Sequence, residues 1–446
     1  MPSILLQKVF TLAAFRISSM KILILAYDFP PFISIGGLRP YSWYKYLPGF
    51  DVDTTVITRD WELDQSSGAN QTEIQPKSVT ERQKNKTLIK VRFTPAIKDR
   101  IAAKLQSDKV RRLRQVVTYL FSFLEFLSLR FDSKAELYVA ADELLKHEKF
   151  DMIIASGKPF ILFRYAALLS KKYKTPWIAD YRDSWTLNHN QSDYSLGPLS
   201  FILNSFYKLV ERKYVSSSSL ITTVAPSMVK VMPPFVKHDN IKIVYNGYDD
   251  DIEEQVKGIL PSTQKFVVSY AGHIYPMQRL EVFLEGAVKF ISESMVTPEE
   301  FEMHFWGIEA DPSAITRIMN YNPVLQKYVH LHNKTGYFEV MKQISISHVL
   351  LLLTSNSDSW LNAKLFDYLV LKRPVLMIGN KTNVMTEILK ETNGGTVAEN
   401  AESATAFLSS QFKVYKNAKP NETVNFQQYS RKNQAEKLYL ILKNMK

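Results

Sequence analysis

The chain has 446 residues, roughly two to three times the usual length of a single domain, so we expect two domains and allow a third. A hydrophobic fraction of 46% and a charged fraction of 22% exclude a disordered chain, and Gly 15 with Pro 20 excludes a collagen-like one. Cys 0 excludes disulfide frameworks, thiolate zinc sites, iron–sulfur clusters and cysteine nucleophiles, and is compatible with a reducing compartment. The net charge of +12 predicts negatively charged partners: phosphates, nucleic acid or an anionic lipid surface.

Residues 1–19 resemble a targeting segment, but their apolar stretch is broken by Lys8 and Arg16 and no cleavage pattern follows. We interpret them as an upstream extension before Met20, with a short membrane-surface anchor as the alternative and a signal peptide as the least favoured reading. Elsewhere in the sequence, no apolar run reaches the length of about 18 residues that a spanning helix needs. The sequence therefore does not predict an integral membrane protein.

Short β-branched runs alternate with longer helical patterns, which indicates βαβ units around parallel sheets. The first series of predicted strands is Lys21–Ala26, Thr54–Thr58, Leu88–Phe93, Asp151–Ser156, Trp177–Asp180, Leu220–Val224 and Ile241–Tyr245. After a polar stretch at 250–264, a second series follows: Phe266–Ala271, Glu302–Trp306, Val329–His332, Val349–Leu353 and Pro374–Ile378. The pattern predicts an α/β fold with two doubly wound, Rossmann-like domains that face each other across a ligand cleft.

We place the first domain at 20–250 and the second at 262–428. The tail, 429–446, reads as one amphipathic helix with its apolar face formed by Ala435, Leu438, Tyr439 and Leu442.

Several motifs are missing from the sequence: GxGxxG after the first strand, GxxxxGK[ST], GxSxG and HExxH. The readings as a dinucleotide oxidoreductase, P-loop NTPase, serine hydrolase or zincin lose their main support. Asp51-Val-Asp53 could hold a metal that bridges a diphosphate, but its place before the second strand favours an ordinary polar turn. We therefore predict no metal site.

The loop after the first strand contains Gly36, Gly37 and Arg39, followed by a helical pattern. Adjacent glycines before a helix let backbone N–H groups approach an anion, and an arginine adds a bidentate phosphate donor. A flexible connector is the alternative.

A second cluster, Asp180, Arg182 and Asp183, follows the strand that begins at Trp177, where residues line the cleft of an open sheet. These carboxylates could orient sugar hydroxyls or act as a base, or an Asp–Arg pair could simply close the loop.

The strongest candidate site lies in the second domain, around Lys364 and Asp367, which are three residues apart and so share one helical face. Lys364 falls in the first helical turn, where the helix dipole disfavours a cation, and an anionic ligand would remove that conflict. Asp367 could accept both hydroxyls of a ribose, although a salt bridge between the two side chains is the alternative. Gly272 and His273 end an earlier strand and permit close backbone approach, and Arg279 is within reach of a phosphate or is a surface residue.

Read together, these segments resemble the GT-B glycosyltransferases, especially the family-4-like branch that builds bacterial surface polysaccharides. The resemblance extends from Met20 over nearly the whole chain and rests on PPFISIGGLRPY, ADYRDSW, VYNGYDD, YAGHIYP and KLFDYLVLKRPVL, in that order.

The resemblance implies that the second domain binds a nucleotide-diphosphate sugar, through Gly272, His273, Arg279, Lys364, Leu365 and Asp367. Lys364 and Arg279 would contact the diphosphate and Asp367 the ribose. The acceptor and phosphate loop would be Gly36, Gly37 and Arg39, and the groups near the reacting sugar would be Asp180, Arg182 and Asp183. Asn246 and Gly247 would mark the crossover between domains, and the last helix would pack on the first domain.

The family also implies retention at the anomeric carbon and no metal or other cofactor, because backbone amides and basic side chains stabilise the departing diphosphate. This chain departs from the family pattern of two glutamates separated by seven residues. Asp367 stands at the second position and Ser359 at the first, with Asp358 one step out of register.

Residues 98–131 combine a basic stretch (Lys98, Arg100, Lys104, Lys109, Arg111, Arg112 and Arg114) with the apolar segment VVTYLFSFLEFLSLRF. This combination suits docking on an anionic bilayer and a polyprenyl-linked acceptor, and the alternative is a helix packed in the first domain. No nucleic-acid-binding motif is visible.

We therefore predict a cytoplasmic glycosyltransferase, peripheral on the inner face of the cell membrane, that transfers a hexose-type unit to a glycan or lipid-linked acceptor. A nucleotide-sugar 2-epimerase of the same fold and a non-catalytic sugar- or membrane-binding relative are the alternatives.

Overall fold

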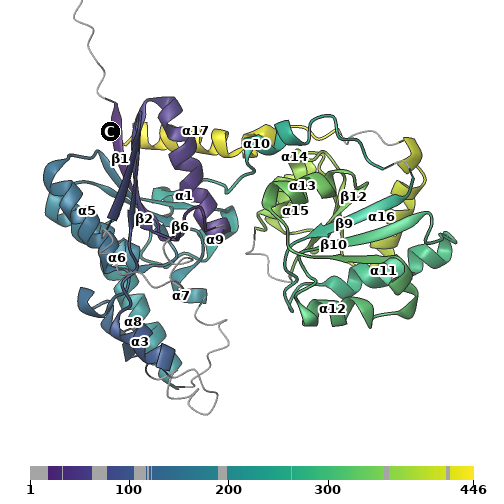
Figure 1. Ribbon diagram of the computed structural model, residues 1–446, viewed down its shortest axis with the longest axis horizontal. Coiled ribbons are helices and arrows are strands. Elements are labelled where there is room, and N and C mark those ends of the chain that lie inside the picture. The colour runs from purple at the N-terminus through teal and green to yellow at the C-terminus, as the bar shows by residue number, and fades with distance from the viewer. Residues whose placement is uncertain are drawn as a thin grey trace, which may run out of the picture.

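The computed structural model describes residues 19–445 apart from 33, 63–77, 105–116, 118–119, 122, 189–197, 263, 356–360 and 418–421. Two α/β units stand side by side, each built on one sheet (Figure 1). Residues 1–18 of the predicted extension, which spans 1–19, lie outside the described residues, and so do Lys109, Arg111, Arg112 and Arg114 of the basic stretch.

The first sheet has the strand order β3-β4-β2-β1-β5-β6-β7-β8. Its strands are β1 (Met20–Leu25), β2 (Val52–Arg59), β3 (Ser78–Gln83), β4 (Lys86–Val91), β5 (Met152–Gly157), β6 (Trp177–Tyr181), β7 (Leu220–Thr223) and β8 (Ile241–Ile243). β5 and β6 are buried at every position, because helices cover both faces of a parallel sheet. This burial explains why their sequences are mostly apolar, apart from Ser156 in β5 and Asp180 in β6.

The described α-helices of the first unit are α1 (Ile35–Tyr46), α3 (Ile97–Lys104), α5 (Ala135–His147), α6 (Ile161–Tyr173), α7 (Trp185–Asn188), α8 (Pro198–Val215) and α9 (Pro226–Lys230). The helix α6 shows how they cover the sheet: Leu162, Phe163, Tyr165 and Leu169 are fully buried and join the core on one sheet face. The short α10 (Asp250–Gln255) begins the passage to the second unit.

The second sheet is parallel throughout its described strands, in the order β11-β10-β9-β12-β13-β14. Its strands are β9 (Phe266–Ala271), β10 (Phe301–Trp306), β11 (Val329–His332), β12 (Val349–Leu353), β13 (Val375–Ile378) and β14 (Gly395–Ala398). The helices are α11 (Leu280–Glu293), α12 (Pro312–Met319), α13 (Tyr337–Ser345), α14 (Lys364–Val370), α15 (Val384–Glu391) and α16 (Ala401–Phe412). The prediction of two doubly wound α/β domains is confirmed.

All twelve predicted strands are present, with ends shifted by a few residues, but β3 and β14 were not predicted. β3 (SVTERQ) is exposed at each of its six positions, so it carries no apolar alternation. It joins the sheet as the antiparallel partner of β4 through a tight turn in which Asn85 has a φ of 58°. Backbone hydrogen bonds to β4 hold this edge strand in the sheet, so its side-chain pattern could not predict it.

The C-terminal helix α17 (Arg431–Lys443) returns to the first unit, as predicted, and lies beside α1 (Figure 1). Ala435, Leu438 and Leu442 are buried against Trp43 of α1 and Met20 of β1. The return path crosses the outgoing one: the Tyr248 N–H donates to Tyr429 O at 3.1 Å, and the Arg431 N–H to Tyr248 O at 2.9 Å.

The crossing point requires a glycine. Gly247 has a φ of +66°, and a Cβ there would lie 2.4 Å from Tyr429 O, inside van der Waals contact. An ion pair of 3.1 Å between Arg431 and the Oδ2 of Asp249 ties the two crossing segments together.

Leu438→Ala removes a fully buried side chain from the contact between α17 and the first unit, so we expect a loss of about 2–5 kcal/mol in the free energy of unfolding. Chemical denaturation followed by circular dichroism measures this loss. Leu440→Ala, on the exposed face of the same helix, is the matched control and should change stability by less than about 0.5 kcal/mol. Equal stability of both variants would contradict the packing of α17 described above.

Candidate active site

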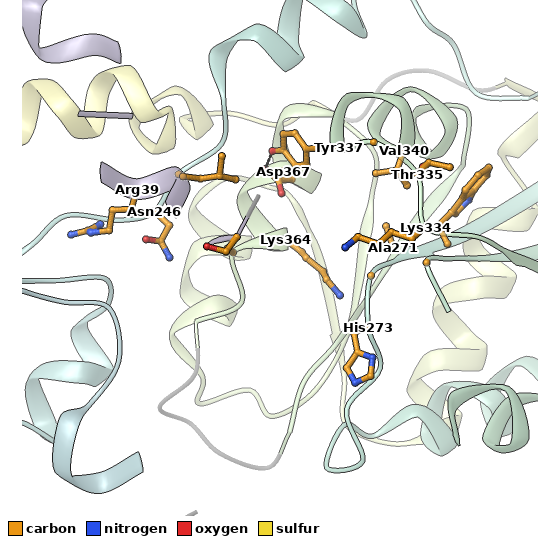
Figure 2. Close-up of a pocket in the computed structure, with 18 of the residues that line it drawn as sticks. Arg39, Asn246, Ala271, His273, Lys334, Thr335, Tyr337, Val340, Lys364 and Asp367 are labelled. Carbon is orange, nitrogen blue, oxygen red and sulfur yellow. Dashed lines mark hydrogen bonds between the residues drawn. The ribbon is translucent and has the colours of Figure 1, made fainter. Parts of the chain in front are cut away.

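A pocket of about 590 Å³ lies where the carboxyl ends of the second sheet face α1 and the crossover (Figure 2). The residues after β9, β10 and β11 contribute Gly272, Gly307 and Lys334, because parallel strands end at the same edge of a sheet. The complete lining is Ser34, Leu38, Arg39, Asn246, Gly247, Ala271, Gly272, His273, Trp306, Gly307, Lys334, Thr335, Gly336, Tyr337, Val340, Ala363, Lys364, Asp367 and Arg431.

Lys364 points into the pocket from the first turn of α14 (Figure 2). Its Nζ donates to Tyr270 Oη at 2.8 Å and lies 4.3 Å from the centre of that ring. Burial lowers the pKa of Lys364 to about 7, because the neighbouring Asp367 charge only partly offsets the loss of water. An anionic ligand that enters the pocket would stabilise the charged form of Lys364, which burial disfavours.

Asp367 sits one turn later on the same face of α14, where it accepts a hydrogen bond of 2.5 Å from Tyr337 Oη. Burial raises the pKa of Asp367 to about 6, against the opposing effects of Arg431 and the Tyr337 hydrogen bond. A salt bridge with Lys364, the alternative that the sequence left open, is not among the ion pairs of the described residues. Both side chains are therefore available to a ligand.

Glycine is required beside Lys364. Gly272 has a φ of +103°, and a Cβ there would lie 2.8 Å from both Cε and Nζ of Lys364. The next strand end repeats the positive φ, since Gly307 has a φ of +85°, and a Cβ there would lie 3.8 Å from the Cα of Gly272. The two glycines keep the floor of the pocket free of side chains beneath the lysine.

The pocket has a positive lining. It contains the four cations Arg39, Lys334, Lys364 and Arg431 and one carboxylate, Asp367. The N-terminus of α13 opens into it at Gly336, with no side-chain cap. A helix N-terminus and basic side chains together favour a phosphate group.

Three buried polar atoms of the lining have no hydrogen-bond partner among the described residues: Asn246 Oδ1, Trp306 Nε1 and Arg431 Nε. Buried polar groups are normally paired, so each is a ready contact for a ligand or for water. Of these unpaired atoms, Trp306 Nε1 and Arg431 Nε are donors and Asn246 Oδ1 is an acceptor.

The first domain reaches the pocket through Arg39, whose guanidinium is almost completely buried. Its Nη2 donates to Asp180 Oδ1 at 2.8 Å, and its Nε lies 3.1 Å from both carboxylate oxygens. The opposite side of the guanidinium donates through Nη1 to Val244 O at 2.6 Å and stacks 4.8 Å from the Trp43 ring. Arg39 therefore links α1, β6 and the crossover.

Asp180 is fully buried and does not line the pocket. The strand register aligns it with Ser156 of β5 and Thr222 of β7, whose hydroxyls donate to its carboxylate at 2.9 and 2.7 Å. With Arg39 as its third partner, this carboxylate is saturated. The structure gives it the role of holding Arg39, in place of the predicted catalytic contact.

Arg182 and Asp183 also lie outside the pocket lining. The Nε of Arg182 donates to Gly157 O at 2.5 Å, and a Cβ on Gly36 would lie 1.5 Å from Arg182 Nη1. Asp183 is half-exposed, with its Oδ2 3.9 Å from Lys158 Nζ. Gly36 therefore makes room for an arginine, where the sequence predicted room for an anion.

The two glycines lie within the first turn of α1, capped by Ser34, and not in a loop before it. Gly37 donates to Ser34 Oγ at 2.9 Å and packs against the backbone of Asp28 and Phe29, where a Cβ would approach to 3.1 Å. Of the three residues predicted for the acceptor loop, only Arg39 lines the pocket. Its neighbours Ser34 and Leu38 line the pocket as well.

The residues predicted to bind the donor divide into two groups by their position relative to the pocket. Gly272, His273, Lys364 and Asp367 line the pocket, and His273 Nδ1 lies 2.9 Å from Asp311 Oδ2. Arg279 instead donates through Nη2 to Glu399 O at 2.6 Å, outside the lining, and the side chain of Leu365 is fully buried in the domain core. Ser359, at the position of the family's first glutamate, lies outside the described residues.

Trp306, Lys334, Tyr337 and Arg431 also line the pocket, and the sequence did not predict them as site residues. Trp306 and Lys334 stand at the ends of predicted strands, so their positions carried a signal that could have been read. Tyr337 and Arg431 reach the pocket from helices whose orientation the sequence does not report.

Asp180→Ala leaves the buried Arg39 without its carboxylate, so we expect a loss of about 3–5 kcal/mol in the free energy of unfolding. Asp183→Ala, three residues along the chain and half-exposed, is the matched control and should cost less than about 0.5 kcal/mol. Chemical denaturation of both variants measures the difference. Wild-type stability of Asp180→Ala would show that the carboxylate does not hold Arg39.

No protein-family model matches the chain, and no curated protein is similar to it in sequence. Solved structures are similar in fold. A glycosyltransferase from Rickettsia africae aligns at a TM-score of 0.59 and 12% identity, over 96% of this chain and 98% of that one. Anabaena HepE, in complex with UDP and glucose, aligns at a TM-score of 0.57 and 13% identity, over 95% of this chain and 100% of that one. UDP-GlcNAc 2-epimerase from Methanocaldococcus jannaschii aligns at a TM-score of 0.50 and 12% identity, over 95% of this chain and 100% of that one. The chain has the two-domain fold of the GT-B glycosyltransferases.

Proposed function

We propose that the protein is a glycosyltransferase that moves a hexose-type sugar from a nucleoside-diphosphate sugar to a glycan or lipid-linked acceptor. The observation that carries the proposal is the positively charged pocket at the strand ends of the second domain, with Lys364 and Asp367 directed into it. In the proposed reaction the bond between the anomeric carbon and the diphosphate breaks, the acceptor oxygen bonds to that carbon, and the hydroxyl proton is released.

The donor occupies the second-domain side of the pocket in this proposal. Its diphosphate lies between Lys364 and the N-terminus of α13, with Lys334 as the second cation in place of the predicted Arg279. Asp367 accepts the ribose hydroxyls. Fixed positive charge at the departing diphosphate lowers the barrier, since the negative charge grows there in the transition state. On this basis we propose transfer without a metal at the diphosphate.

The acceptor enters from the first-domain side, where Ser34, Leu38 and Arg39 line the pocket. The resemblance to enzymes of surface-polysaccharide synthesis supports retention of the anomeric configuration and an acceptor of that class. UDP in the HepE complex, and a UDP-sugar as the substrate named for the epimerase, support uridine as the nucleoside of the donor.

Thermal unfolding with UDP, GDP, ADP and CMP tests the donor site. We expect UDP to stabilise the wild type by about 2.7 kcal/mol at a hundred times its dissociation constant. Lys364→Met should abolish most of this gain, because it removes the ammonium and keeps a side chain of similar length. Lys381→Met, an exposed lysine outside the pocket lining, is the control and should bind as the wild type does.

The pH dependence of UDP-glucose binding isolates Lys364, because the diphosphate of a nucleotide sugar keeps its charge between pH 6 and 8. With a pKa of about 7, the lysine is charged below that pH and loses its charge above it, so binding should weaken as the pH rises through 7. Lys364→Met keeps the titration of Asp367 and should lose this weakening. No nucleotide binding at any pH would overturn the donor site.

A 2-epimerase of the same fold is the second candidate, favoured by the structural similarity to the archaeal epimerase. It would release a free epimer of the sugar without any acceptor. Incubation with UDP-GlcNAc alone, followed by separation of the products, distinguishes the two functions. Binding of the donor with neither reaction would favour the non-catalytic alternative.

We also propose that the first domain docks on the cytoplasmic face of an anionic membrane, where a lipid-linked acceptor is anchored. Exposed apolar side chains lie on residues 120–127 (Leu120, Phe123 and Leu127) and on α8 (Phe201, Ile202 and Leu209). The two segments are in contact through Phe123 and Phe206, whose ring centroids are 4.2 Å apart. Lys208, Arg212 and Lys213 are exposed on the same helix, which gives the patch the charge that anionic lipids attract. Within the described residues, no helix is long and apolar enough to cross a bilayer.

Sedimentation with vesicles tests this surface. The wild type should bind vesicles that contain phosphatidylglycerol more strongly than neutral ones, and Phe201→Ser with Leu209→Ser should bind several-fold less. Both side chains are more than two-thirds exposed, so the fold is expected to persist. Val414→Ser with Leu440→Ser, exposed on other elements, is the control. Equal binding by both double variants would contradict the proposed surface.

A further inference from the structure

A second group of ligating side chains lies on the outer strands of the second sheet, outside the pocket lining. Glu302 and His304 belong to β10 and His330 to β11, and one ligand atom of each lies within 4.8 Å of the others. His304 Nε2 is 3.1 Å from Glu302 Oε1, and His330 Nε2 is 3.6 Å from Glu302 Oε2. These separations are close to those between ligand atoms that share one metal ion.

The backbone brings the three side chains together. Parallel pairing of β10 with β11 sets His304 directly opposite His330. Glu302 precedes His304 by two residues, so both project from the same sheet face, which alternates with the buried residues Phe301, Met303 and Phe305. The group therefore does not depend on a loop conformation, and it is preorganised on the two outermost strands.

A further histidine fixes the orientation of the first. His304 Nδ1 lies 2.8 Å from His332 Nε2, so its second ring nitrogen, Nε2, is the one that faces Glu302 and His330. The centre of the His332 ring lies 5.0 Å from that of His304 and 3.8 Å from that of the Trp306 ring, and its plane is nearly parallel to both. Histidines that bind metals commonly have such an outer partner on the other ring nitrogen, which sets the ring orientation.

We propose that Glu302, His304 and His330 form a binding site for one divalent transition-metal ion of the Zn²⁺ type, oriented by His332. Two imidazoles and one carboxylate are a ligand set that suits zinc, whereas Mg²⁺ and Ca²⁺ prefer oxygen ligands. Three protein ligands leave a fourth, tetrahedral position for water, and the exposed edge at His330 gives the ion a path of entry. The site is separate from the donor pocket, so it does not depend on the proposed function.

One cation competes for the carboxylate. Lys265 Nζ lies 3.2 Å from Glu302 Oε2, and its side chain is about one-third exposed. Metal binding requires this lysine to turn toward solvent, which a partly exposed side chain can do at low cost. Lys265→Met should therefore bind Zn²⁺ more tightly than the wild type. If the cluster were only an ion-pair network, this variant would gain no affinity for any metal.

Competition with a chromogenic zinc chelator, on tag-free protein freed of metal beforehand, measures the affinity. We expect one Zn²⁺ per chain, and no displacement of it by a large excess of Mg²⁺. His332→Ala should weaken binding about 10–100-fold, as loss of an outer partner does, and His304→Ala and His330→Ala by more than that. Circular dichroism checks that each variant is folded, and His330, at the exposed edge, is the decisive one.

His147→Ala is the matched control, because His147 also lies 3.1 Å from a glutamate, Glu143, on the exposed face of α5. It should bind Zn²⁺ as the wild type does. The proposal is overturned if the wild type binds no Zn²⁺, or if His330→Ala and His304→Ala bind one ion with wild-type affinity.

Discussion

The ion pair between Arg39 and Asp180 is the interaction on which the arrangement around the pocket depends. Asp180 is aligned by the register of β5, β6 and β7, and it holds the guanidinium through three donor–acceptor contacts. Arg39 in turn donates to the carbonyls of Val244 and Tyr245, where the chain leaves the first domain. A desolvated charge needs every one of these partners, so the crossover and the first-domain wall of the pocket are fixed together.

The second-domain wall combines groups that are poorly stabilised without a ligand. Burial lowers the pKa of Lys364 to about 7 and raises that of Asp367 to about 6, so both charged forms are disfavoured in the free protein. The orphaned Nε1 of Trp306 adds an unpaired polar group to the same wall, and the crossover adds the orphaned Oδ1 of Asn246 to the pocket. Such a wall costs stability, and an anionic, hydroxyl-bearing ligand satisfies several of its members at once. This balance supports the donor assignment in the second domain.

Sequence pattern predicted the framework well because the framework depends on burial. Each predicted strand was an apolar or β-branched run, and the last helix showed its face through Ala435, Leu438 and Leu442. Pattern did not predict β3, whose six residues are all exposed, because backbone pairing with β4 holds it in place. In the site, Lys364 and Asp367 were predicted because they share a helical face, and Tyr337 was missed because it approaches from another helix.

The sequence by itself determined twelve of the fourteen described strands, their division into two α/β units, the amphipathic last helix and the pair of titratable groups on α14, since these follow from local periodicity. Only the tertiary structure decided what the polar residues at the strand ends do. Asp180 and Asp183 look equivalent in the sequence, yet register buries the first against Arg39 and leaves the second half-exposed. Likewise, pairing between β10 and β11 creates the Glu302, His304 and His330 cluster from residues nearly thirty positions apart. Chemistry at a site depends on distances between elements, and those distances exist only after the elements pack.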